Sequence, residues 1–261
     1  MNHHPAVEQL SRCWSSLDEL FDGLDDEQWS TPSLCPDWTV RGVLVHLGAL
    51  EHMLSGEPPG SMAEALPLGK AGEWMREVAE LSDADVFDRY REVVAVRGDE
   101  LAAMSDDDFG LPCMTPVGPG TYGRFMDVRV FDFWVHEQDV RVPLGMPGHE
   151  NGPAAAAAIH EIEMSLGYII GRKVGLPDGT SITIDLTGPV DRVFHVVVDG
   201  RAAQVAALES ADVTLHTDST TFALLACGRI DPQEPIDDGR ITWDGDAEWG
   251  ERAARHLAFT M

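Results

Sequence analysis

The stretch FDFWVHEQDVR, residues 131–141, places Asp132 and His136 four positions apart among large apolar residues. The apolar residues recur at helical spacing and predict a helix over residues 122–144. Because positions i and i+4 lie on one face of a helix, both side chains point the same way and can bind one ion. Zinc accepts such nitrogen and carboxylate ligands, as do nickel, iron and manganese. The spacing alone equally allows a core histidine that hydrogen bonds to Asp132.

A third ligand must come from another part of the chain. The segment CPDWTVRGVLVHLGALEHML, residues 35–54, opens with a proline-containing turn and offers Asp37 or Thr39 as the N-cap of a helix. His46 continues the inward positions of this helix, so we expect it to face the core. Two histidines and one carboxylate would leave an open position for water or substrate, as in catalytic zinc sites built from helices of a bundle.

The spacing of apolar residues divides the rest of the chain into a helical region and a region of strands. Three further helices are predicted over residues 5–24, 84–104 and 152–174, with Gly- and Pro-rich loops over 55–69 and 106–121. Near residues 175–180 the period changes to that of strands, interrupted by helices at 219–227 and 247–257. The strands are expected in SITIDLTG, RVFHVVVDG, RAAQVAAL, ADVTLHT and RITWDG. This predicts a bundle of four or five helices over residues 1–177 and a small α+β domain over residues 178–261.

Charge and cysteine usage narrow the partners and the compartment. Forty-five acidic and eighteen basic residues give a net charge of -27, which repels nucleic acid and anionic lipid. The four cysteines form no CxxC pair, which argues against a disulfide framework and against a cysteine zinc site. With no signal-like start or membrane-length apolar run, we expect a cytoplasmic protein that acts on small molecules.

Two motifs resemble those of a known family. SLCPDWTVRGVLVHLGALE, residues 33–51, is similar to the opening motif of the mycothiol-dependent maleylpyruvate isomerase family, whose first domain is a DinB-like metal-binding helix bundle. RVFDFWVHEQDVR, residues 129–141, resembles the second metal motif of that family. Residues 211–229 and 240–261 resemble the sterol-carrier-like domain that follows the bundle. Together these segments extend the resemblance over nearly the whole chain.

The resemblance implies a ligand set and a chemistry. The metal ligands of the family fall on His46, Asp132 and His136. The family is expected to have glutamate at position 132, and aspartate is one methylene shorter, so the ion position and metal preference need not be those of the family. The implied cofactors are a divalent metal, zinc or alternatively nickel, and mycothiol as thiol cosubstrate. The implied activity is cis–trans isomerisation or S-transfer on a small electrophile through a metal-activated thiolate.

Two other functions remain open at this stage. The scaffold suits a metal-dependent hydrolase that activates water instead of sulfur, and it also suits a non-catalytic module that binds a small molecule. Asp139 can orient the imidazole of His136 or pair with Arg141 or Arg129. Arg229 can anchor a carboxylate of the substrate or thiol, although a cation at the end of a helix is favourable in any protein. Glu51, at i+5 from His46, is expected at the pocket wall or the surface.

Overall fold

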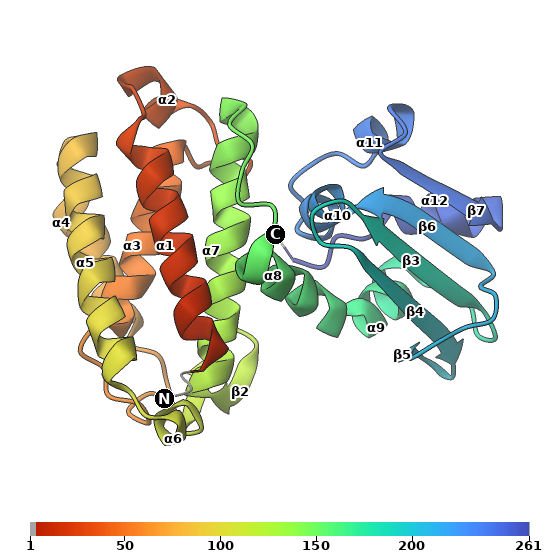
Figure 1. The fold of residues 1–261 in the computed structure, drawn as a ribbon, viewed down its shortest axis with the longest axis horizontal. Helices are drawn as coiled ribbons and strands as arrows, with labels where there is room; N and C mark the ends of the chain where they lie inside the picture. Colours follow the sequence, from red (N-terminus) through yellow and green to blue (C-terminus); the bar gives the residue numbers. More distant parts are fainter. Residues whose placement is uncertain (1–3, 261) are drawn as a thin grey trace. The chain divides into compact units, whose positions relative to one another are not determined.

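The computed structural model describes residues 4–260, and the chain divides into two compact units between Gly148 and His149. The first unit is helical and the second contains a five-stranded sheet (Figure 1). The predicted order of a helical region followed by a mixed α/β region is therefore confirmed. The domain boundary expected at residue 177 was placed where the hydrophobic period changes from helix to strand. The compact units divide earlier, because the helix that follows Gly148 packs on elements of the second unit.

Four long helices form the first unit. They are α1 (Pro5–Asp22), α3 (Val40–Leu54), α5 (Asp83–Ala103) and α7 (Tyr122–Leu144). Helices α1 and α3 each contact both α5 and α7, so the four enclose a common core, as Figure 1 shows. The predicted limits of the helix over 122–144 agree with those of α7. Each helix buries an apolar face, which is the main source of its stability in the bundle.

Local capping fixes where the two helices of the candidate site begin. The Thr39 side chain accepts a hydrogen bond from the backbone of Gly42, and Thr121 does the same for Arg124. Thr39 is thus the N-cap of α3, and Asp37 instead lies in the preceding turn with a left-handed φ of 66°. Helix α7 ends at Gly145, which adopts φ 63°, a conformation that glycine tolerates without strain.

Several elements of the first unit are not evident from the hydrophobic period. Helix α4 (Leu68–Val78) packs on α3, and strands β1 (Pro112–Thr115) and β2 (Gly118–Thr121) form an antiparallel hairpin in the region expected as loop. The short helices α2 (Asp26–Ser30) and α6 (Asp106–Phe109) complete the unit. Glycine and proline near these segments mask the pattern, so local sequence favours loops there.

The second unit begins with helix α8 (Gly152–Met164), which contacts α10 (Ser219–Ala226). The single helix predicted over 152–174 is interrupted at Ser165 and continues as α9 (Leu166–Tyr168) and a π-helical segment over Ile169–Val174. The sheet has the order β5-β4-β3-β6-β7, antiparallel except for the parallel pair β3 and β6. Its strands are Ser181–Thr187, Arg192–Asp199, Arg201–Val205, Val213–Asp218 and Ile241–Gly245, from β3 to β7.

One face of this sheet is buried and the other is polar. Alternate residues such as Ile184 and Leu215 are fully buried, and α10 and α12 (Ala247–Arg255) contact the strands that carry them. A short helix, α11 (Gln233–Asp237), precedes β7. The opposite face presents half-buried polar residues, including Asp185 and His216, as expected for a sheet covered on one side.

Among residues 4–260, no helix has both the length and the apolar character needed to cross a membrane.

The contact between α3 and α4 gives a stability prediction. A Cβ added at Gly48 would lie 2.6 Å from Cζ2 of the buried Trp74, so Gly48→Ala forces the helices apart. We expect a loss of about 1–3 kcal/mol in the free energy of unfolding, measured by urea denaturation.

The matched control is Gly72→Ala in α4, where an added Cβ meets nothing within 4 Å. Alanine is the better helix former, so this variant should be about 1 kcal/mol more stable than wild type or unchanged. Equal stability of the two variants would contradict the described packing of α3 on α4.

Candidate metal centre

The three residues predicted as metal ligands come together in the structure. His46 on α3 and Asp132 and His136 on α7 each offer a ligand atom, and these atoms all lie within 4.8 Å of one another. Nε2 of His136 is 3.5 Å from Oδ1 of Asp132, and Nε2 of His46 is 3.6 Å from Oδ2 of the same carboxylate. The carboxylate therefore lies between the two imidazoles, whose centroids are 4.7 Å apart.

The donor set fits a divalent ion. Nε2 of His46 is buried and has no hydrogen-bond partner among the described residues. An unsatisfied polar atom in the interior is unfavourable, and a metal bond satisfies it. Two imidazole nitrogens and a carboxylate are ligands that zinc and nickel accept. The side chains of His46 and Asp132 are 26% and 24% exposed, so this group lies near the protein surface.

Asp139 lies within hydrogen-bond distance of the ring of His136. Oδ2 of Asp139 is 2.8 Å from Nδ1 of His136, and both side chains are buried. With a proton on Nδ1 donated to Asp139, the unprotonated Nε2 is directed toward Asp132 and is available to a metal. The two arginines considered as alternative partners bind other acids: Arg141 donates to Glu137 at 2.7 Å and Arg129 to Glu51 at 3.0 Å.

The Asp132 carboxylate is held in its ionised form. Burial raises the pKa of Asp132, but the guanidinium of Arg129 outweighs burial, with a further contribution from His136 and His46 when these rings are protonated, and holds this pKa well below the usual aspartate value. The Arg129 contribution includes a hydrogen bond from Nη1 to Oδ2 of Asp132. A carboxylate ligand must be deprotonated to bind a metal, so this environment favours binding at neutral pH.

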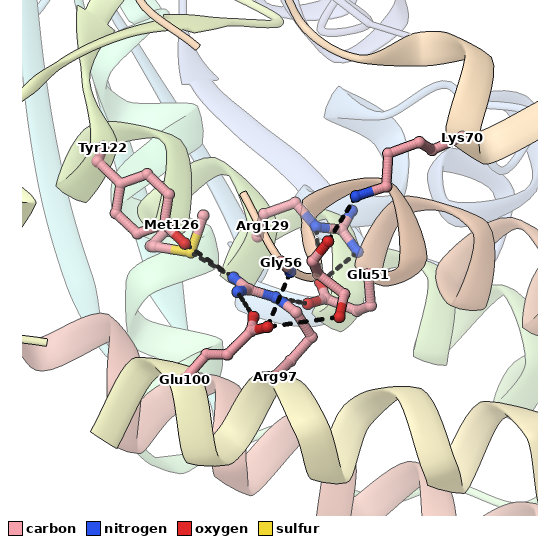
Figure 2. Close-up of polar contacts among 9 residues, drawn as sticks. Glu51, Gly56, Lys70, Arg97, Glu100, Tyr122, Met126 and Arg129 are labelled. Carbon is pink, nitrogen blue, oxygen red and sulfur yellow. Dashed lines mark hydrogen bonds and ion pairs between the residues drawn. The ribbon is translucent and has the colours of Figure 1, made fainter. Parts of the chain in front are cut away.

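A buried charge network of Glu51, Arg97, Glu100 and Arg129 lies beside the candidate ligands. Oε1 of Glu51 accepts two hydrogen bonds from Arg129, both 3.0 Å, and Oε2 accepts one from Arg97 at 3.2 Å (Figure 2). Arg97 also donates to Glu100 at 2.5 Å and to the Tyr122 hydroxyl at 2.9 Å. Glu51, Arg97 and Arg129 are at most 1% exposed.

The expected position of Glu51 at the pocket wall or surface is wrong. Its carboxylate is in the core because it balances the charge of two buried arginines. The sequence spacing between His46 and Glu51 does not reveal this burial, because the arginines that bind Glu51 belong to α5 and α7. One feature of the sequence does indicate a buried charge here. Arg129 lies three residues before Asp132 on the same helix, so a cation that faces the proposed site needs a further acidic partner.

Two other residues near the candidate site were not singled out as ligands. Trp38 lies against both imidazoles, with ring centroids 4.8 Å from His46 and 5.7 Å from His136. The half-buried Cys35 offers a sulfur within 4.8 Å of ligand atoms on His136 and Asp139. Both residues belong to the turn before α3, which is therefore part of the site.

Arg229 lies in the second unit, directly after α10. Its backbone N–H donates to the carbonyl of Leu224 at 2.8 Å, and its Nη1 donates to the carbonyl of Cys227 at 2.9 Å. These bonds place a cation at the C-terminal end of a helix, where it is favourable. The role of Arg229 as an anchor for a substrate carboxylate stays a prediction.

Fold and site together define a class of protein: a helix bundle that carries a two-histidine, one-carboxylate group, followed by an α+β unit. The family model described as the mycothiol maleylpyruvate isomerase N-terminal domain matches residues 10–141, and the MDMPI C-terminal domain matches residues 156–252. The chain therefore belongs to the mycothiol maleylpyruvate isomerase family, which confirms the resemblance of its motifs. The division between Gly148 and His149 falls between the two matched regions.

Solved structures agree on the fold. A crystal structure of the mycothiol-dependent maleylpyruvate isomerase is 13% identical, with 95% of this chain and 98% of that chain covered and a TM-score of 0.59. A point mutant of that enzyme is 14% identical, with the same coverage and TM-score. Sterol carrier protein 2 from Yarrowia lipolytica, 12% identical over 40% of this chain and 92% of its own, has a TM-score of 0.27, too low to carry an argument. None of the curated proteins matches the chain.

The buried charge network gives a second stability prediction. Glu51→Ala removes the shared acceptor of Arg97 and Arg129 and leaves two buried cations short of negative charge. We expect a loss of about 3–5 kcal/mol in the free energy of unfolding, measured by urea denaturation followed by circular dichroism.

Glu8→Ala is the comparison for this experiment. Glu8 pairs with Arg12 on the exposed face of α1, where the two side chains are 69% and 53% exposed. Loss of such a surface pair changes stability by less than about 1 kcal/mol. A Glu51→Ala effect as small as that of Glu8→Ala would contradict a buried, charge-balancing Glu51.

Proposed function

We propose that this protein is a metal-dependent enzyme that uses mycothiol to isomerise a small electrophile or to transfer sulfur to it. In an isomerase the thiolate adds to a cis double bond, permits rotation and is eliminated, whereas in a transferase it stays attached to the product. The observation that carries the proposal is the group of three ligand atoms within 4.8 Å, formed by two helices of a chain that belongs to the family. The maleylpyruvate isomerase activity named for the structural neighbour supports this reaction class.

His46, Asp132 and His136 would hold the ion, with zinc the first candidate and nickel the second. The bound ion would lower the pKa of a thiol, so that the nucleophilic thiolate forms at neutral pH. Asp139 keeps His136 in the tautomer that presents Nε2, and Arg129 keeps Asp132 ionised. Trp38 covers the imidazoles and excludes water from that side. We place the reaction in the cytoplasm, on the sequence argument from cysteine usage.

The test is turnover of maleylpyruvate with and without mycothiol by the zinc-loaded protein. We expect turnover only when the thiol is present. His46→Ala and Asp132→Ala should each lower kcat/KM by about 100-fold or more, because loss of even a partner that supports a metal ligand costs about 10- to 100-fold.

His52→Ala is the matched control, since His52 also lies on α3 but packs against Trp74, with ring centroids 5.5 Å apart. It should retain activity. Hydrolysis of an ester or amide substrate at equal rates without thiol would favour an enzyme that activates water. A zinc-loaded protein that binds small electrophiles without converting any of them would favour the non-catalytic binding module.

A further inference from the structure

Each nitrogen of the Arg129 guanidinium donates a hydrogen bond to a carboxylate. Nε and Nη2 donate to Oε1 of Glu51, both at 3.0 Å, while Nη1 donates to Oδ2 of Asp132. The guanidinium carbon lies 4.6 Å from the ring centroid of Phe133, which packs against its face. With 1% exposure, the side chain is shielded from solvent. Arg129 is therefore a rigid group in contact with one candidate metal ligand.

The hydrogen bond from Arg129 restricts the orientation of the Asp132 carboxylate more than its other surroundings do. Its side chain is 24% exposed, and its distances to the two histidine nitrogens, 3.5 and 3.6 Å, exceed those of hydrogen bonds of good geometry. Among the described residues, the bond from Arg129 is the one short enough to hold the carboxylate plane between the imidazoles. A ligand that is oriented before the metal arrives loses less conformational freedom on binding.

Glu51, the partner of Arg129, is itself held in place by a second arginine. Oε2 of Glu51 accepts from Arg97, which is itself bound to Glu100 and to the Tyr122 hydroxyl (Figure 2). Acidic and basic side chains alternate along this series of ion pairs from Asp132 to Glu100. Arg129 and Arg97 therefore each lie between two carboxylates. The network joins α3, α5 and α7 and terminates at the candidate ligand.

We infer that Arg129, held by Glu51, is the positioning residue that orients the Asp132 carboxylate for metal binding. The inference rests on the proposed function insofar as that function requires the metal. It assigns to Arg129 and Glu51, the part of the network next to Asp132, a role in metal affinity in addition to their role in stability. Aspartate at this position has a shorter reach than glutamate, and Arg129 supplies the fixed contact that determines where its oxygens lie.

Arg129→Lys and Arg97→Lys are a matched pair of variants. Each keeps a buried positive charge beside Glu51, but only Arg129 contacts Asp132. Lysine is a point charge and cannot contact two carboxylates in the parallel manner of a guanidinium. In competition titrations of the metal-free, full-length protein with Zn²⁺ and a chromophoric chelator, we expect Arg129→Lys to weaken binding by about 10- to 100-fold. Arg97→Lys should stay within about threefold of wild type, because lysine keeps the positive charge that pairs with Glu51 and position 97 does not touch a candidate ligand.

Two further readouts separate positioning from general destabilisation. The visible spectrum of the Co²⁺-substituted protein should change in Arg129→Lys and stay that of wild type in Arg97→Lys. In an Asp132→Ala background, adding Arg129→Lys should leave Zn²⁺ affinity unchanged, because the group that it positions is gone. Equal affinity of wild type and Arg129→Lys, or equal losses in both lysine variants, would overturn the inference.

If Arg129→Lys does not fold, Glu51→Gln replaces it, since glutamine keeps the shape and an acceptor oxygen but removes the charge that holds Arg129. The expected loss of Zn²⁺ affinity is then about tenfold, and an unchanged affinity would overturn the inference. Wild-type protein that takes up no Zn²⁺ would contradict the proposed function and the inference together. Tight binding by both wild type and Arg129→Lys would contradict the positioning role alone.

Discussion

The ion pairs of Glu51 with Arg97 and Arg129 are the interaction on which the rest of the first unit depends. Charges buried this deeply are tolerated only when they remain paired, so any shift of α3, α5 or α7 that separates them is strongly unfavourable. Because α3 carries His46 and α7 carries Asp132 and His136, the pair of Glu51 with Arg129 also joins the two helices that carry the candidate ligands. One network therefore contributes to the stability of the bundle and lies next to the candidate site.

The candidate ligands differ in how they are supported. His136 is oriented from behind by Asp139, and Asp132 is fixed from the side by Arg129, while the buried Nε2 of His46 faces them without a hydrogen-bond partner among the described residues. Supporting partners of this kind set the orientation and basicity of metal ligands. The side chains of His46 and Asp132 are partly exposed, so the candidate ligands lie near the surface of the first unit.

Sequence reasoning succeeds where local pattern determines the outcome. The period of α7, the i and i+4 spacing of Asp132 and His136, and the resemblance of the motif around His46 were sufficient to predict three residues that the structure brings together. It fails where the outcome depends on which elements become neighbours. The partners of Glu51 belong to other helices, the hairpin before α7 lies among turn-forming residues, and the helical pattern of α8 does not reveal that it packs on the second unit.

The most direct test is the metal content of untagged, purified protein, measured by elemental analysis in wild type and in His136→Ala and Asp132→Ala. We predict close to one zinc or nickel ion per wild-type chain, its loss in both variants, and an unchanged far-ultraviolet circular dichroism spectrum. A wild-type protein that contains no divalent metal and cannot be reconstituted with zinc or nickel would contradict the account and leave His46, Asp132 and His136 as polar residues of a binding protein.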